Sequence, residues 1–153
     1  MKKYLLCTIL AAFIFAGCEK EKTTDNNLPV HANDTASITH IKWHLTHFVD
    51  VTNKTVEEPL ANNENAYWIK FDTTTFEGKS FSNIIMGYIH IDASKGKMDF
   101  LTVGGTEICE YYDGTKFINS LNQVHDYMVT SENNLVLFYD NNTKYLQFER
   151  IME

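Results

Sequence analysis

Cys18 is the residue with the most definite predicted chemistry in this chain. It follows a positively charged start at Met1–Lys3, an apolar run over Tyr4–Phe15, and the small residues Ala16 and Gly17. A bulky, small, small, cysteine order after an export signal is typical of the site at which bacterial lipoproteins are cleaved and acylated. The apolar run is well short of the roughly 20 residues that span a bilayer. The sequence therefore predicts a signal peptide at 1–17 and a membrane anchor of acyl groups (palmitate) on Cys18.

Three histidines suggest a metal site, but their spacing argues against one. If residues 40–47 form a strand, His40 and His44 share a face and lie about 13 Å apart. One ion bonded at about 2.0–2.1 Å to each imidazole cannot bridge that gap. His47 would point to the opposite face of the strand. We therefore expect no metal ion, and no other cofactor is indicated.

Carboxylates are numerous, but no spacing brings two of them together. A general acid and a general base must converge in one cleft. The serines lack the surroundings of a nucleophile elbow, and no glycine-rich phosphate loop occurs. We expect no catalytic residues and hence no enzyme. The acids considered for this role are Glu57, Glu58, Asp92, Asp99 and Glu110.

Aromatic side chains offer a candidate contact surface. Tyrosine combines an apolar ring with a polar hydroxyl, so a patch of tyrosines can bind a ligand or a protein. Tyrosine is also common on strands, and plain packing is the favoured alternative. The tyrosines in question are Tyr88, Tyr111, Tyr112, Tyr139 and Tyr145. We single out Tyr111 and Tyr112, with Glu57 and Glu58 of a long polar loop at 50–66, as the candidate contact residues.

Cys109 is the remaining cysteine of the mature chain, because Cys7 leaves with the signal and Cys18 is acylated. It has no partner for an intrachain disulfide. A reactive or intermolecular thiol is one interpretation. A buried, inert side chain is the one we favour.

Charge and length exclude several classes of protein. Removal of residues 1–17 from the 153 leaves 136, with 11 basic and 20 acidic side chains and a net charge of −9. Nucleic acid binding requires clustered Lys and Arg, so it is excluded. Adhesion to anionic lipid by charge is excluded for the same reason. The length suits one domain.

Residues 18–37 form a polar segment that we interpret as a flexible tether. It has a single Leu, a single Val and no aromatic residue. Within it, Asp34-Thr35-Ala36 fits a short motif for O-glycosylation on Thr35, which some Gram-negative envelope proteins carry.

Residues 38–153 predict one mainly β (α+β) domain. Alternating apolar residues indicate strands, and Gly96 suits the hairpin turn at 94–97 because glycine accepts positive φ. Apolar residues at helical spacing predict one short helix over 115–126. The expected architecture is a strongly curved antiparallel sheet or partly closed barrel of about 6–8 strands, since curvature hides sheet edges. The expected strands lie at 40–46, 67–71, 84–92, 98–103, 127–130, 135–139 and 145–151, with a turn at 140–143 between the last two.

In its order of short motifs, this domain resembles the META, or HslJ-like, family of bacterial envelope proteins. The matching segments are Trp43-His44-Leu45, Phe71, Gly78-Lys79-Ser80-Phe81-Ser82-Asn83, Gly87-Tyr88, Thr106-Glu107-Ile108-Cys109, Phe117-Ile118-Asn119-Ser120-Leu121, Leu135-Val136-Leu137 and Leu146-Gln147-Phe148. Ser82 stands where that family has its first cysteine, so a pairing with Cys109 is absent. The resemblance implies a curved sheet with a helix, no catalytic residues, and links to envelope stress and secretion.

Two functions follow as expectations. The first is a lipid-anchored lipoprotein, at the outer membrane of the bacterial cell envelope, that acts as a non-catalytic binding or accessory module. Its partner would be an envelope protein or a small molecule. The alternative is a lipocalin-like carrier that holds a small apolar ligand inside the sheet.

Overall fold

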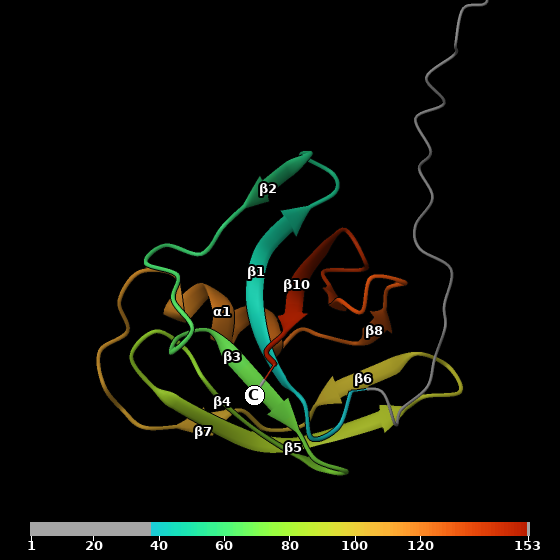
Figure 1. Ribbon diagram of the computed structural model, residues 1–153, viewed down its shortest axis with the longest axis horizontal. Coiled ribbons are helices and arrows are strands. Elements are labelled where there is room, and N and C mark those ends of the chain that lie inside the picture. Colours follow the sequence, from blue (N-terminus) through green and yellow to red (C-terminus); the bar gives the residue numbers. More distant parts are fainter. Residues whose placement is uncertain (1–37, 153) are drawn as a thin grey trace, which may run out of the picture.

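Eight antiparallel strands close into a barrel (Figure 1). The computed structural model describes residues 38–152, so the predicted signal peptide (1–17) and tether (18–37), with Cys18 and Thr35, lie outside the described residues. The strands of the described part are β1 (Lys42–Asp50), β2 (Thr55–Glu57), β3 (Trp68–Phe71), β4 (Thr75–Lys79), β5 (Ile84–Asp92), β6 (Lys97–Phe100), β7 (Gly104–Gly105), β8 (Asp126–Val129), β9 (Leu135–Tyr139) and β10 (Lys144–Arg150).

The barrel closes between the first and last strands. Its strand order is β1-β3-β4-β5-β6-β8-β9-β10, and β10 pairs with β1 from Trp43↔Arg150 to Asp50↔Lys144. The short strands β2 and β7 pair with β1 and β5 and lie outside this ring. Closure removes the free edges of the barrel. The expected mainly β fold with a curved antiparallel sheet and one short helix is therefore confirmed.

A β-bulge at Thr46 changes the predicted orientation of the histidines. The pairing of β1 with β10 shifts between Leu45 and His47, and the Thr46 hydroxyl donates to the Gln147 carbonyl at 3.0 Å. An extra residue reverses the alternation of faces beyond it. His44 pairs with Glu149 and His47 with Gln147, so these two histidines share the outer face. The prediction that His47 points to the opposite face from His44 is wrong for this reason.

His40 also departs from its predicted place. It precedes β1 and has a positive φ of 61°, so it is not part of the strand that was expected to carry it. Its backbone N–H donates to the Phe71 carbonyl at 2.8 Å. The face-sharing argument for His40 and His44 therefore does not apply.

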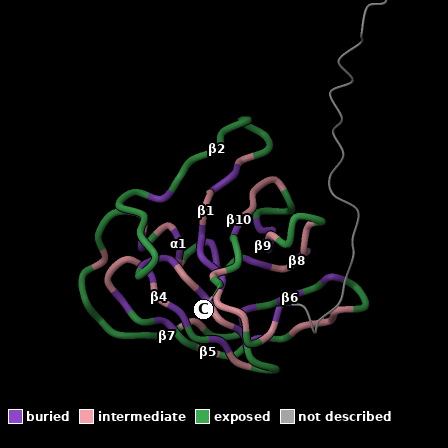
Figure 2. Tube along the Cα trace, viewed as in Figure 1, coloured by how far each residue is buried: buried purple, intermediate pink, exposed green. Residues whose placement is uncertain are grey.

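Figure 2 shows buried residues along the barrel strands and α1, and their side chains fill the interior of the barrel. Alternate residues of the strands point inward, as period 2 requires. They pack into one cluster with the apolar face of the helix. The largest fully buried side chains are Trp43, Tyr67, Tyr127, Phe71, Phe117, Phe148, Ile38, Leu45, Ile69, Ile85, Met98 and Leu121.

The helix α1 (Gly114–Leu121) is shorter than the predicted 115–126. Phe117 and Leu121 are buried in the barrel core, as helical spacing predicts. After Leu121 the backbone tightens, because Gln123 and Val124 donate to carbonyls three residues back. Such bonds satisfy the last carbonyls of a helix while ending it. Val124 still reaches the core, which is why the apolar pattern ran past the end of the helix.

Two predicted turns are confirmed, and the predicted long loop is partly strand. Gly96 has a φ of 65° in the hairpin between β5 and β6. Asp140, Asn141 and Asn142 all have positive φ between β9 and β10. The 50–66 segment contains β2, which forms a hairpin with the end of β1. Residues 51–54 form the turn of this hairpin, and residues 58–66 form a loop that leads to β3.

Candidate functional site

Exposed apolar side chains gather at the end of the barrel where β4 ends and β5 begins. We call this group the rim surface and define it as Leu60, Phe81, Ile108, Tyr111 and Tyr112. Leu60, Ile108, Tyr111 and Tyr112 are each about 60% exposed, and Phe81 is half-buried. The members come from three segments: the 58–66 loop, the β4–β5 turn and the 106–113 loop.

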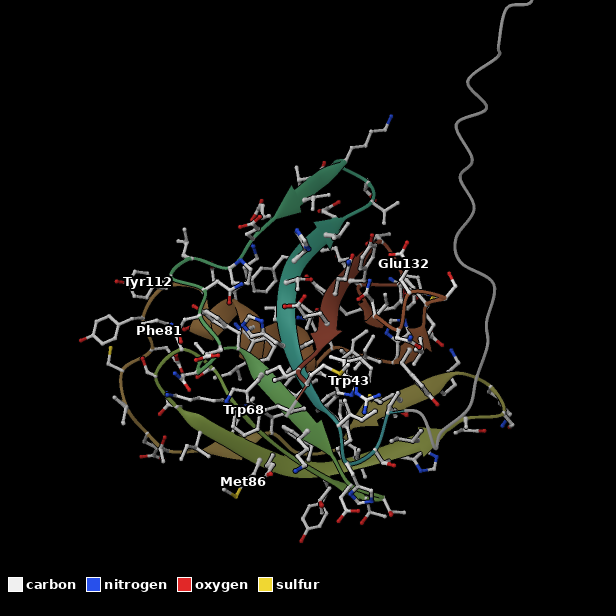
Figure 3. All side chains as sticks on the ribbon, in the orientation of Figure 1. Trp43, Trp68, Phe81, Met86, Tyr112 and Glu132 are labelled. Carbon is white, nitrogen blue, oxygen red and sulfur yellow. The ribbon has the colours of Figure 1, made fainter. Side chains whose placement is uncertain are left out.

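Ring contacts connect the rim surface to the core. The Tyr112 ring meets Phe81 edge-on at a centroid separation of 4.5 Å (Figure 3). Phe81 lies 6.1 Å from the ring of Tyr67, which in turn meets Phe117 of α1 at 6.0 Å. Edge-to-face pairs of this kind add about 0.5–1.5 kcal/mol beyond their burial. The exposed Tyr112 is thus continuous with fixed core aromatics.

The buried Tyr67 joins the two loops of the rim surface. Its hydroxyl donates to the Leu60 carbonyl at 3.1 Å and accepts from the Asp113 N–H at 3.2 Å. The Asp113 carboxylate completes a triangle by accepting from the Leu60 N–H at 2.7 Å. Burial raises the pKa of Tyr67 above its ordinary value, which keeps the hydroxyl protonated and able to donate. Leu60 is therefore held beside the start of α1.

Glu110 fixes the 106–113 loop against the β4–β5 turn. Its carboxylate accepts hydrogen bonds from the Ser80 hydroxyl, from the Asn83 side-chain amide at 2.6 Å, and from the Ser82 N–H at 3.2 Å. Hydrogen bonds to a charged group are worth more than neutral ones. The chain from Ile108 to Tyr111 is thereby held in one position on the barrel.

The Asn83 side chain satisfies the remaining polar groups of this loop. Its oxygen accepts from the Ile108 N–H and from the Thr106 hydroxyl, both at 2.8 Å. Its amide also donates to the Ile108 carbonyl at 2.8 Å. With Ser80 and Glu110 it makes a connected polar network, and such networks specify one loop position when every member is satisfied.

The proximity of Ser80 to Glu110 does not indicate nucleophilic catalysis. The Ser80 side chain is fully buried. Its oxygen accepts from the Asn83 N–H at 3.0 Å while its proton goes to the carboxylate. A nucleophile must reach a substrate carbon, and this hydroxyl is enclosed and already bonded. The arrangement holds the 106–113 loop against the β4–β5 turn.

The structure brings two of the four predicted contact residues into the rim surface. Tyr111 and Tyr112 belong to the rim surface. Glu57 of β2 pairs with Lys116 of α1 at 2.7 Å, which ties the hairpin to the same helix. Glu58 is exposed beside Glu57 and takes no part in this pairing. Three tyrosines of the sequence hypothesis lie elsewhere: Tyr88 is exposed on β5, Tyr139 is in the core and Tyr145 packs on Phe138.

Cys109 is exposed, which overturns the favoured prediction that it is buried. The reason is the alternation along its loop. Its neighbour Glu110 turns inward to Ser80 and Asn83, and this leaves Cys109 facing solvent. No cysteine partner lies within the described residues.

His44 and Asp92, two of the remaining predicted groups, have ordinary structural partners. His44 donates its Nε2–H to the Asn63 carbonyl at 3.1 Å, and its Nδ1 lies 3.6 Å from the Glu149 carboxylate. Asp92 is bonded by Lys95 and Ser94 in the β5–β6 turn, which lowers its pKa to about 2. Within residues 38–152 no group of three or more His, Cys, Asp or Glu side chains is placed to hold a metal ion. In the same range, no helix has the length and apolar character to cross a membrane.

The sequence pattern missed the residues that support the rim surface. Ser80 and Asn83 carry a local signal, because a serine that bonds the N–H three residues on is typical of turns. The contact of Glu110 with Asn83 and that of Tyr67 with Asp113 join residues 27 and 46 positions apart. No local pattern marks such pairs.

Comparisons with known proteins show the family and the fold. A family model described as a domain of unknown function (DUF4847) matches residues 19–150. The NMR structure of a protein from Burkholderia xenovorans is similar, with a TM-score of 0.63, 19% identity and 100% of both chains covered. A crystal structure of a DUF4847 family protein from Bacteroides vulgatus ATCC 8482 has a TM-score of 0.57 and 18% identity over 76% of this chain and 96% of that chain. No curated protein matches this chain.

These matches correct the family resemblance drawn from short motifs. The family model and the structural neighbours point to DUF4847, and none points to a META or HslJ-like domain. The motifs that suggested META are short apolar segments of strands and a helix, which any curved antiparallel sheet supplies in a similar order. The links to envelope stress and secretion depended on that resemblance and no longer apply.

Proposed function

This chain belongs to the DUF4847 family, and from that premise we propose that it is a lipid-anchored protein of the bacterial cell envelope whose barrel is a non-catalytic binding module. The acylated residue in this proposal is Cys18, and the membrane is the outer membrane. The family match begins at residue 19, directly after Cys18, which fits a mature chain that starts at that cysteine.

The rim surface carries the binding proposal. Exposed Leu, Ile and Tyr side chains normally move freely, and ordering them on binding costs conformational entropy. Here the two loops that bear them are fixed in advance by the Tyr67 triangle and the Glu110 network. Contact groups that are already held in place bind more tightly for the same area. Fixed, exposed aromatics are the residues from which interface hot spots are made.

The partner that fits this surface is another envelope protein. The rim surface contains no charged side chain, and tyrosine is enriched at protein interfaces. Its side chains are exposed over three separate segments, whereas small ligands prefer a single concave pocket. A small molecule is the alternative partner, and the experiment must distinguish it from a protein.

Crosslinking in intact cells tests the binding proposal. A photoreactive phenylalanine analogue is placed at position 112 of the full chain, and the matched control carries it at the exposed position of Glu132. We expect position 112 to crosslink to one specific envelope protein. This crosslink should be lost when Tyr111→Ala is added, and it should not form from position 132. The captured protein and this chain must then bind each other when both are purified. Equal products at both positions, or none at 112, would contradict the proposal, and a small-molecule adduct would replace the protein partner.

The anchor has its own test. Metabolic labelling with a radioactive fatty acid compares the wild-type chain with Cys18→Ala. We expect label on the wild type alone, because the cysteine sulfur and the new amine are the acceptors. Equal labelling of the two chains would remove the anchor from the proposal.

An apolar carrier is the second candidate, because eight-stranded barrels can hold one small ligand. The barrel interior argues against it. Large aromatic side chains such as Trp43, Tyr67 and Phe148 are fully buried there together with the helix residue Phe117. Native mass spectrometry of the full chain from the envelope checks this point, and a co-purified apolar ligand that survives gentle transfer would restore the carrier.

A further inference from the structure

A second exposed apolar surface lies on the outer wall of the barrel and runs along β5 from the end that bears the rim. Along β5, Ile85 and Ile89 point inward, so the alternate residues Ile84, Met86 and Tyr88 point outward. Each of these three side chains is more than half exposed. We call them, together with Leu101, the β5 stripe. Leu101 is 62% exposed and adjoins Tyr88, since its N–H donates to the Tyr88 carbonyl at 2.8 Å.

Glycines leave one flank of the stripe uncovered. Met86 pairs with Gly104 and Ile85 with Gly105 of β7. A side chain at Gly105 would meet the Ile84 carbonyl oxygen at 2.1 Å, so glycine is required there by close backbone approach. Without side chains on β7, nothing from that strand covers Met86. The stripe therefore presents contiguous apolar atoms, whereas exposed apolar residues of ordinary monomers are scattered singly.

The chain enters the domain at the end of the barrel that bears Tyr88. Tyr88 pairs with Thr75 of β4, and the Ile89 N–H donates to the Thr74 carbonyl at 2.9 Å. This β3–β4 turn begins at Asp72, whose carboxylate lies 3.9 Å from His40. His40 follows Ile38, the first residue described. The segment that leads back to Cys18 therefore joins the domain beside one end of the stripe.

Chain length limits how far the domain can lie from an acylated Cys18. Residues 18–37 comprise twenty positions, which span at most about 70 Å when fully extended. A random coil of that length averages roughly 25 Å. A short tether keeps the domain at a high effective concentration near the bilayer. Even a weak apolar contact with the lipid is then formed most of the time.

We propose that the β5 stripe rests on the lipid bilayer to which the chain is anchored, an inference that rests on the lipid anchor of the proposed function. Ile84, Met86 and Leu101 enter the boundary between head groups and acyl chains, and the Tyr88 hydroxyl stays among the head groups. Tyrosine suits that boundary because one end of it is apolar and the other is polar. The stripe contains no charged side chain, so its contact is apolar and insensitive to salt.

Charge favours a bilayer over a second copy of this chain as the occupant. Two copies brought together face to face would oppose net charges of −9 each, and like charges disfavour association. On β4, the stripe is bordered by Glu77 and Lys79, opposite Met86 and Ile84. A zwitterionic head-group layer can meet both signs, so this border does not oppose contact with it.

Fluorescence quenching by brominated lipid tests the proposal. The full, acylated chain is reconstituted in phosphatidylcholine vesicles whose acyl chains carry bromine, with Met86→Trp as the reporter and Glu132→Trp as the matched control. Figure 3 shows Met86 and Glu132 on different sides of the barrel. After subtraction of the wild-type signal from Trp43 and Trp68, we expect marked loss of fluorescence at position 86 and little at 132. The loss should be the same at low and high salt, and Tyr88→Asp should abolish it.

Each alternative outcome identifies which idea fails. Flotation of the vesicles reads the anchor by itself. A chain that floats with equal quenching at both positions overturns the stripe contact and leaves the anchor standing. A wild-type chain that does not float refutes the anchor and, with it, the tethered contact.

A second measurement in intact cells avoids the Trp substitutions. The photoreactive analogue at position 88 should yield a lipid adduct. A crosslinked dimer of this chain, or a crosslink to another protein, would overturn the proposal.

Discussion

Replacing Glu110 by Gln should loosen the rim of the barrel and destabilise the whole domain. The carboxylate accepts hydrogen bonds from Ser80, Asn83 and Ser82. Glutamine keeps one acceptor oxygen and places a donor amide where the second oxygen was. At least one of the three donors then loses its acceptor, and the negative charge that strengthened all three is gone.

The size of the effect follows from the number of bonds. A hydrogen bond to a charged group contributes about 1.5–3 kcal/mol, so losing one and weakening two should lower the free energy of unfolding by about 2–4 kcal/mol. The unfolding entropy is near 2.1 cal/mol/K per residue, summed over the 115 described residues. With that entropy, each kcal/mol lost from the free energy of unfolding lowers Tm by about 4 °C. We therefore expect Tm to fall by about 8–16 °C.

Urea unfolding, followed by tryptophan fluorescence, and calorimetry measure this effect. The matched control is Glu107→Gln, an exposed acid three residues earlier in the same loop, for which we expect almost no change. A double-mutant cycle with Ser80→Ala separates the Ser80 bond from the other two. Equal Tm values for Glu110→Gln and Glu107→Gln would refute the claim that the polar network stabilises the fold.

Three further predictions follow from the core and the turns. Gly87→Ala should destabilise the domain by about 3 kcal/mol or more, because its Cβ would meet the Thr102 carbonyl oxygen at 1.8 Å; chemical denaturation measures this. Phe117→Ala should cost about 3–5 kcal/mol by the same assay, since the ring is fully buried, and a cost below 1 kcal/mol would contradict its core position. For Asp92, a pKa lowered to about 2 by Lys95 means stabilisation present above its unfolded value and lost as pH falls through about 2. The Tm difference between wild type and Asp92→Asn should therefore shrink between pH 5 and pH 2, and a constant difference would exclude this account.

Local pattern was enough to predict the helix and seven of the eight barrel strands, but it did not predict β4 or the closure into a barrel. Alternation identified the strands, and glycine and asparagine identified turns that have positive φ. The pairing of β1 with β10, which closes the barrel, joins Trp43 to Arg150. Nothing within a window of ten or twenty residues encodes that contact. A curved sheet and a closed barrel therefore look the same in the sequence.

The errors also have local physical causes. The bulge at Thr46 reversed the face of His47, because one inserted residue changes every later position on the strand. Cys109 was expected to be buried on residue type alone. The inward turn of Glu110 decided the exposure of its neighbour, and that turn depends on the Asn83 and Ser80 contacts made across the rim.

The rim surface and the β5 stripe depend on different kinds of bond, although the same segment, 104–110, borders both. The first residues of this segment form β7, which is held by backbone pairing with Ile85 and Met86. At its other end, Ile108 and Glu110 are held by the side chains of Asn83 and Ser80. Removing a side-chain acceptor at Glu110 leaves the backbone pairing in place. Glu110→Gln should therefore reduce partner capture at position 112 while the lipid contact at position 86 persists, and equal loss of both would mean that the two surfaces are one.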